Sequence, residues 1–220
     1  MPDVSPAPSA DPDGPLPVPA DLHWRDPQAL LDRTLAEWGG HRPLWLFAYA
    51  SLLWKREFEV AEHRPARVAG WHRAFRMRSR VNRGTPDNPG LVFALMAGGS
   101  CCGGVYRLPP DQAEASLRQL WLREMPTGVY EPRWLACRTP QGTVHALAFT
   151  LDRRHPAHTG RLDDDLLLAI LRQAQGRYGS TLDYLLRTAA QLHQLGIQDR
   201  EIQRLVHLAR RHGLVHPDRP

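Results

Sequence analysis

One carboxylate stands on the apolar face of a predicted helix and is the strongest chemical signal in the sequence. The spacing predicts a helix over Pro110–Met125 whose buried face carries Leu117, Leu120 and Trp121. Glu124 follows them by seven, four and three residues, so its side chain shares that face. Burial and the helix C-terminus both disfavour negative charge there and raise a pKa. Such a carboxyl suits general acid–base catalysis, and the alternative is an ion pair with an arginine.

A second candidate is a turn of small residues directly after a predicted strand. The strand Leu44–Ala50 runs into the sequence Tyr49-Ala50-Ser51-Leu52. Successive backbone N–H groups in such a turn can point into one concavity and bind a carboxylate or an oxyanion. Turns of this kind are common, so an ordinary connection between two elements is the alternative.

Other chemistry is not indicated. His155 and His158 lie in a predicted turn without a cysteine or carboxylate at ligand spacing, so we expect no metal site. Cys101 and Cys102 stand between pairs of glycines and are interpreted as small strand residues rather than nucleophiles. The sequence also has no glycine-rich phosphate loop and no nucleophile elbow. The residues themselves therefore indicate no metal site, no phosphate-binding loop and no serine nucleophile.

The chain is expected to have a short tail and one domain. Residues 1–20 contain seven prolines, three aspartates and no basic residue, which predicts a disordered Pro-rich tail over residues 1–25. A single domain is expected over residues 26–215. It begins with a helix over Pro27–Trp38, which Asp26 caps and Gly39 ends.

The remaining elements predict an α+β fold, with strands in the middle and helices at the end. Short apolar or alternating runs predict strands at Leu44–Ala50, Ala66–Trp71, Ala74–Arg80, Gly90–Met96, Gly103–Leu108, Arg133–Arg138 and Val144–Leu151. Apolar residues at helical spacing predict three further helices at Asp163–Ala174, Thr181–Leu195 and Asp199–His212.

Composition narrows the class of protein. The chain has 220 residues and a formal net charge of +5, but only Lys55 among its 28 basic residues is a lysine. This arginine bias weakens a nucleic-acid interpretation of the positive charge. No apolar run approaches the roughly 18 residues that a membrane helix needs, and the N-terminus has no secretory signal pattern. Three sparse cysteines favour a reducing compartment, so we expect a cytoplasmic protein without nucleic-acid or membrane partners.

These features together resemble the ChaC family, the γ-glutamylcyclotransferases that act on glutathione. The resemblance runs from Trp45 to Val206, and the run Arg123-Glu124-Met125 is similar to the bacterial branch. The matching stretches, in order, are Phe47–Trp54, Gly70–Phe75, Arg83-Gly84, Pro89-Gly90, Val105–Pro109, Leu120–Met125, Gly128–Tyr130, Asp152–Pro156, Asp183–Leu185 and Leu195–Asp199.

The resemblance implies a γ-glutamylcyclotransferase-like mixed β-barrel with surrounding helices and a helical C-terminal part. It implies cyclisation of the γ-glutamyl group of glutathione to 5-oxoproline with release of Cys-Gly, without a cofactor. Glu124 matches the catalytic glutamate of the family. Tyr49, Ala50, Ser51 and Leu52 match its substrate-binding loop, which acts through backbone amides. Tyr130 and Tyr184 match pocket aromatics. Arg78 or Arg83 could reach the substrate carboxylates, although structural pairing is the preferred interpretation.

Two departures concern the substrate end. Ala50 replaces a family glycine, which matters if the position needs a positive φ or a close approach of the substrate. Thr181 stands near a family asparagine. The alternatives are therefore a cyclotransferase for other γ-glutamyl amides or peptides, and a catalytically weak regulatory or binding protein linked to cation transport.

Overall fold

The computed structural model describes residues 24–215. Most of the expected tail, up to residue 23, lies outside the described residues. Its last two residues belong to the folded unit, because the N–H of Trp24 donates to the carbonyl of Thr127 at 2.8 Å. The guanidinium of Arg25 likewise donates to the carbonyl of Tyr130 at 2.7 Å. The described domain therefore starts two residues earlier than expected.

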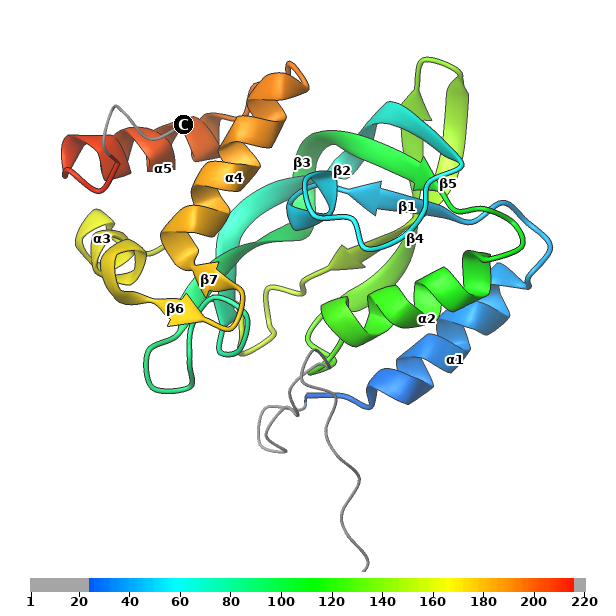
Figure 1. Ribbon diagram of the computed structural model, residues 1–220, viewed down its shortest axis with the longest axis horizontal. Coiled ribbons are helices and arrows are strands. Elements are labelled where there is room, and N and C mark those ends of the chain that lie inside the picture. Colours follow the sequence, from blue (N-terminus) through cyan, green and yellow to red (C-terminus); the bar gives the residue numbers. More distant parts are fainter. Residues whose placement is uncertain (1–23, 216–220) are drawn as a thin grey trace, which may run out of the picture.

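Five strands close into a barrel (Figure 1). They are β1 (Trp45–Ala48), β2 (Glu62–Ser79), β3 (Gly90–Arg107), β4 (Glu131–Thr139) and β5 (Gly142–Thr150). The order is β1-β3-β2-β4-β5, and β1 closes the barrel by pairing in parallel with β5 and antiparallel with β3. Every residue of β1 is buried. The expected mixed barrel is confirmed.

Two pairs of expected strands are single strands in the structure. The strands expected at Ala66–Trp71 and Ala74–Arg80 are both parts of β2, and those at Gly90–Met96 and Gly103–Leu108 are both parts of β3. The glycines in these segments predicted breaks between strands, but in the structure they lie within continuous strands. Gly70 has a φ of +79° at the register shift between Ala69 and Trp71, as expected for a β-bulge. The long β2–β3 hairpin can therefore bend around the barrel without ending.

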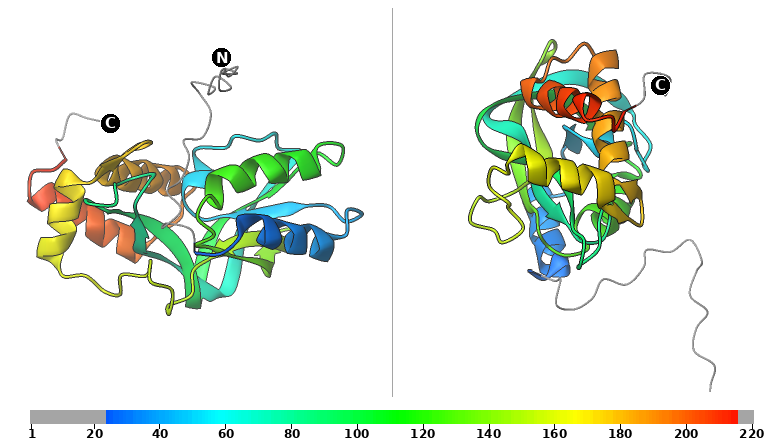
Figure 2. Two further views of the ribbon diagram at one scale, coloured as in Figure 1. Left: turned by 90° about the horizontal axis from the view of Figure 1, so that it is seen from below. Right: turned by 90° about the vertical axis from the view of Figure 1, so that its left-hand side faces the viewer.

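The helices form two groups on opposite sides of the barrel (Figures 1 and 2). On one side lie α1 (Pro27–Trp38), with its predicted Asp26 cap, and α2 (Ala113–Glu124). On the other lie α3 (Asp164–Gln173), α4 (Thr181–Gln194) and α5 (Arg200–Arg211). A short hairpin of β6 (Gln175–Gly176) and β7 (Gly179–Ser180) precedes α4, and a 3₁₀ turn, η2 (Ser51–Leu53), follows β1. All predicted helices are present. The helix α2 starts three residues later than predicted, because residues 110–112 form a turn.

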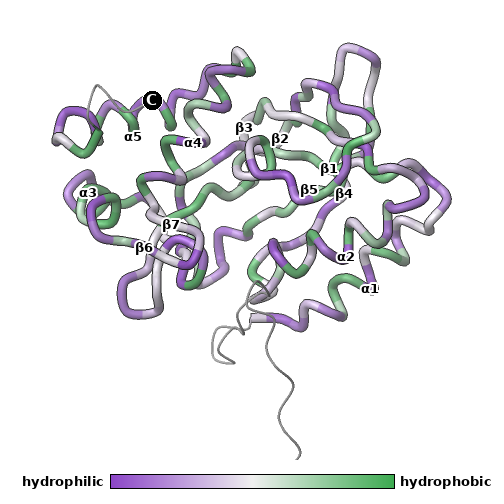
Figure 3. Tube along the Cα trace, viewed as in Figure 1, coloured by the Kyte–Doolittle hydropathy of each residue, from purple (hydrophilic) through white to green (hydrophobic). Residues whose placement is uncertain are grey.

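The core fills the barrel and the gap between the barrel and the helices. Phe47, Phe93, Leu95 and Leu147 are each at most 1% exposed. Apolar residues of the strands gather in the centre of the molecule, as the hydropathy colouring shows (Figure 3). Burial of this apolar surface is the main favourable term in folding. A charged group in this apolar interior needs partners that compensate for its removal from water.

One buried cation connects the barrel to the C-terminal helices. Arg73 on β2 is 5% exposed. Its guanidinium donates to the carbonyl of Tyr49, to the carbonyl of Cys102 at 2.7 Å and to the carboxylate of Asp199. Asp199 is also the N-cap of α5, where it accepts from the N–H of Ile202 at 3.1 Å. All three guanidinium nitrogens have partners, as a desolvated charge requires.

We predict that Arg73→Met strongly destabilises the protein, because it leaves the Asp199 carboxylate without its cation. Removing one partner of a buried pair costs about 3–5 kcal/mol. Chemical denaturation measures this difference in the free energy of unfolding. The control is Arg118→Met, which breaks an exposed pair with Glu114 and should cost no more than about 0.5 kcal/mol. A loss below about 1 kcal/mol for Arg73→Met would show that the cation is not a structural link.

Candidate active site

A cavity of about 230 Å³ lies where the barrel meets α2, η2 and α4. Glu124 from the end of α2, Tyr130 from the residue before β4, Tyr184 from α4 and Ser51 from η2 all line it. The elements that carry these residues come from four separate parts of the chain. The fold therefore brings together four of the residues that the sequence singled out.

The cavity holds Glu124 in surroundings that oppose its negative charge. The side chain is 14% exposed, and its Oε1 lies 3.2 Å from Nε of Arg123. Burial raises the pKa of Glu124 above its ordinary value, and the attraction of Arg123 lessens the shift without cancelling it. Arg123 is itself held by the carbonyl of Lys55 at 2.7 Å. The structure thus contains a feature of each interpretation of Glu124. The carboxyl contacts an arginine, as an ion pair would, and it still has a raised pKa, as a general acid or base would.

Three buried phenols interact electrostatically with Glu124: Tyr130 and Tyr184 line the same cavity, and Tyr49 lies outside its lining. The hydroxyl of Tyr49 donates to the carbonyl of Phe149 at 2.9 Å, and the oxygen of Tyr184 accepts from the N–H of Phe93 at 3.1 Å. Burial raises the pKa of Tyr49, Tyr130 and Tyr184, and the neighbouring Glu124 adds to each shift. All three phenols therefore stay protonated around neutral pH. They are therefore uncharged neighbours of the carboxyl.

The turn after β1 offers backbone donors at the edge of the cavity. No group among the described residues accepts from the N–H of Ser51 or Leu52, at the start of η2. Free N–H groups at the start of a helical turn attract anions. Ser51 lines the cavity, whereas Tyr49, Ala50 and Leu52 are buried and lie outside its lining.

The structure shows the surroundings of Ala50 and Thr181, the two residues that depart from the family pattern. Ala50 has a φ of −143°, so this position does not use the left-handed conformation for which glycine is favoured. Thr181 is fully buried, outside the cavity lining, where its hydroxyl donates to the carbonyl of Arg83 at 2.9 Å and accepts from the N–H of Leu91 at 3.2 Å. Thr181 therefore joins α4 to β3 and to the loop that carries Arg83.

Arginines line the rest of the cavity. Arg83 is 5% exposed and contacts Asp183 at 3.3 Å, so the expected structural pairing is confirmed. Arg78 and Arg80 also line the cavity, and no carboxylate of residues 24–215 lies within ion-pair distance of either. Nothing in the sequence indicated that Arg80 would reach the site. Trp24 was missed altogether, because nothing near it in the sequence shows that it lines this cavity.

Other reactive groups in the described part of the chain are placed elsewhere. Burial raises the pKa of Cys101 to about 11, which suppresses its thiolate form. No group of three or more His, Cys, Asp or Glu in residues 24–215 is arranged to hold a metal ion. Within the same residues, no helix is long and apolar enough to cross a membrane.

Comparison with known proteins places this arrangement in a family. The family described as ChaC-like protein matches residues 44–212. A glutathione-specific γ-glutamylcyclotransferase of Escherichia coli is 37% identical over 185 residues, which cover 83% of this chain and 80% of that protein. The rat glutathione-specific γ-glutamylcyclotransferase 1 is 28% identical over 212 residues, covering 93% and 86% of the two chains.

A solved structure has the same fold as this chain. A crystal structure of a yeast γ-glutamyl cyclotransferase specific to glutathione superimposes with a TM-score of 0.70 at 20% identity. The match covers 79% of this chain and 98% of the yeast chain. The barrel and its helices are thus those of the γ-glutamyl cyclotransferase fold. The chain belongs to the ChaC family.

We predict that Glu124→Gln gains stability relative to the parent as pH rises from about 4 to 7. A raised pKa in the folded state means that the protonated carboxyl is favoured by folding. That contribution is fully present below the unfolded-state pKa and is lost as pH rises through the folded-state pKa. Glutamine resembles the protonated form at every pH and keeps the contribution. Thermal melts of both proteins across this range measure the difference.

Glu131→Gln supplies a control of opposite sign. Burial pushes the pKa of Glu131 upward, but hydrogen bonds from Arg33 and Arg25 outweigh it and leave the pKa lowered. This variant should therefore lose stability relative to the parent as pH rises. If Glu124→Gln also loses stability with rising pH, the contact with Arg123 dominates and the pKa of Glu124 is not raised.

Proposed function

We propose that this protein cyclises the γ-glutamyl group of glutathione to 5-oxoproline and releases cysteinylglycine, with Glu124 as general acid and base. The observation that carries the proposal is the placement of Glu124 in a cavity lined by Tyr130, Tyr184 and Ser51, with a pKa raised by burial. The names of the E. coli and rat relatives support glutathione as the substrate.

The reaction needs one bond formed, one bond broken and a transfer of protons. The α-amine nitrogen of the γ-glutamyl group attacks the γ-carbonyl carbon, and the amide bond to cysteine breaks. Two protons leave the α-ammonium nitrogen, whose pKa is roughly 8. Two protons arrive at the departing cysteinyl nitrogen, so no proton is gained or lost overall. A single carboxyl can carry these two protons one after the other, and the proposed chemistry uses neither a metal nor a cofactor.

The shape of the site supports an intramolecular reaction. The attacking nitrogen and the carbonyl carbon belong to the same molecule, so the enzyme has to hold the bent conformation rather than unite two reactants. The free N–H of Ser51, which lines the cavity, is suited to a carboxylate or to the oxygen that becomes negative in the transition state. Arg78 and Arg80 supply cations for the carboxylates of the tripeptide.

The compartment and the partners follow from the same proposal. All three cysteines are free, which supports a reducing compartment, and we place the enzyme in the cytoplasm. The arginines beside the cavity suit a small anionic substrate, and the proposal involves neither nucleic acid nor a membrane.

The test of the function is the conversion of glutathione by the purified protein. Mass spectrometry should detect 5-oxoproline and cysteinylglycine in equal amounts. γ-Glutamyl-alanine, measured beside glutathione, distinguishes the broader alternative of a cyclotransferase for other γ-glutamyl compounds. Absence of 5-oxoproline from both substrates would contradict the proposal and favour a regulatory or binding role.

We predict that Glu124→Gln lowers kcat by a factor of about 10²–10⁴, the usual contribution of general acid–base catalysis. Glutamine keeps the volume of the side chain but cannot transfer a proton. The variant should remain folded and still bind glutathione, which calorimetry measures directly. Glu114→Gln on the exposed face of α2 is the matched control and should keep the parent's turnover. Turnover of Glu124→Gln within about threefold of the parent would exclude the proposed role.

A further inference from the structure

The wall of the cavity beside Glu124 is a short loop, residues 125–130, that links α2 to β4 and carries Tyr130. A neighbouring segment, residues 24–27, contacts this region at several points, and we call it the N-terminal clamp. The N–H of Trp24 donates to the carbonyl of Thr127 at 2.8 Å, and the indole N–H of Trp121 donates to the carbonyl of Pro27 at 2.8 Å. Trp24 also lines the cavity. The clamp therefore contacts both the helix that carries Glu124 and the loop that carries Tyr130.

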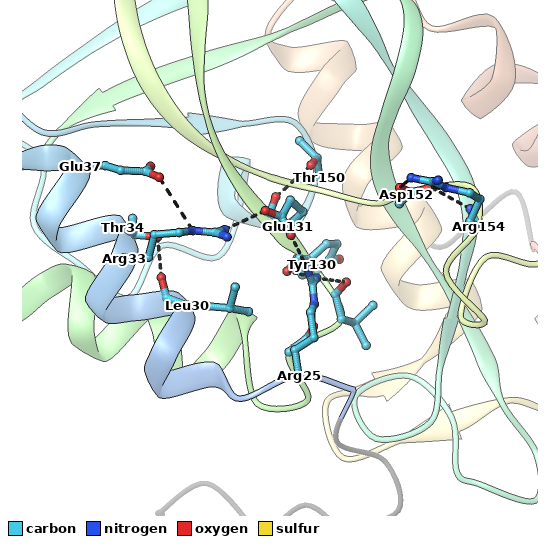
Figure 4. A network of polar contacts seen from close by, with 12 residues as sticks. Arg25, Leu30, Arg33, Thr34, Glu37, Tyr130, Glu131, Thr150, Asp152 and Arg154 are labelled. Carbon is cyan, nitrogen blue, oxygen red and sulfur yellow. Dashed lines mark hydrogen bonds and ion pairs between the residues drawn. The ribbon is translucent and has the colours of Figure 1, made fainter.

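Arg25 makes the densest set of contacts in the clamp (Figure 4). Its Nε donates to the carbonyl of Gly128 at 3.0 Å, and its Nη2 donates to the carbonyls of Val129 at 3.0 Å and Tyr130 at 2.7 Å. Its Nη1 pairs with the carboxylate of Glu131. One guanidinium thus holds four consecutive residues. Three of its contacts fix backbone positions rather than side chains.

The backbone of the clamp also packs tightly against the loop. Gly128 has a φ of +64°, and a Cβ added there would lie 2.4 Å from the carbonyl oxygen of Arg25. Only glycine permits so close an approach in this conformation. Arg25 therefore contacts the loop through its main chain as well as through its guanidinium.

A second arginine provides an internal comparison. Arg33 on α1 pairs with the same Glu131 carboxylate at 2.7 Å (Figure 4). It makes no hydrogen bond to the carbonyls of residues 128–130. The two arginines share one ion-pair partner, and only Arg25 holds the backbone of the loop.

We propose that Arg25 is a positioning residue of the active site: its guanidinium fixes the loop backbone so that Tyr130 stays beside Glu124. The proposal rests on the proposed function and extends it to a segment outside residues 44–212, the part of the chain that matches the family. Release of the loop lets the phenol of Tyr130 move away from the carboxyl. Displacements of about 1 Å at a reacting centre can cost 100-fold in rate.

The test compares Arg25→Met, Arg25→Lys and Arg33→Met, assayed well below the melting temperature of every variant. Arg25→Met should lower kcat roughly tenfold or more, with KM for glutathione within about threefold of the parent. Arg25→Lys should not restore kcat, because one ammonium group cannot contact all four acceptors. Arg33→Met should keep kcat within about twofold, since it removes ion pairs to Glu131 and Glu37 and no contact with the loop backbone.

Hydrogen exchange gives a readout that does not depend on activity. Mass spectrometry of the peptide covering residues 126–133 should show faster amide exchange in Arg25→Met than in the parent or in Arg33→Met. If the parent itself produces no 5-oxoproline, the proposed function fails, and the exchange measurement alone decides whether Arg25 holds the loop.

Four results would overturn the positioning role. They are unchanged exchange in Arg25→Met, kcat of Arg25→Met within about twofold of the parent, full recovery of kcat by Arg25→Lys, and an equal loss of kcat in Arg33→Met. Full recovery by lysine would mean that only the positive charge beside Glu131 matters. An equal loss of kcat in Arg33→Met would lead to the same conclusion.

Discussion

The arrangement of the site depends on the interactions of one buried group, the guanidinium of Arg73. It lies between the carbonyl of Tyr49, at the start of the proposed substrate turn, and the carboxylate of Asp199, at the start of α5. A cation removed from water is tolerable only when its donors are satisfied. The turn, strand β3 and the C-terminal helices therefore have to meet at one point. Ser51, two residues after Tyr49 in this turn, lines the cavity.

Two parts of the cavity wall differ in electrostatic character. Around Glu124, burial raises the pKa of the carboxyl and so favours its protonated form, although Arg123 opposes this. Burial also keeps the phenols of Tyr49, Tyr130 and Tyr184 protonated. Along β2 and the loop after it, the cavity is lined by arginines that suit an anionic ligand. A substrate with carboxylates and one reacting amide can be held at one side and can exchange protons at the other. This division is the physical basis of the proposed cyclotransferase activity.

Local sequence signals predicted the elements and one central residue. The helix over Pro27–Trp38 was confirmed with its bounds, because Asp26 and Gly39 cap its ends, and helical spacing alone placed Glu124 on the buried face of α2. The long strands were divided wrongly, since a glycine such as Gly70 reads as a break although a bulge absorbs it. The roles of Arg25 and Arg73 could not be predicted. Their acceptors lie up to 106 and 126 residues away, and an isolated arginine carries no sign of its partner.

Burial makes the carboxyl of Glu124 a group that binds its proton more tightly than an ordinary glutamate does. The most direct test is a ¹³C NMR titration of protein labelled at the glutamate side-chain carboxyl, with Glu124→Gln used to assign the resonance. We expect Glu124 to titrate above the ordinary glutamate pKa, whereas Glu131 in the same spectra should titrate below it. A titration of Glu124 at or below the ordinary value would mean that Arg123 holds it as an ionised structural partner. That result would contradict its assignment as the group that carries the proton.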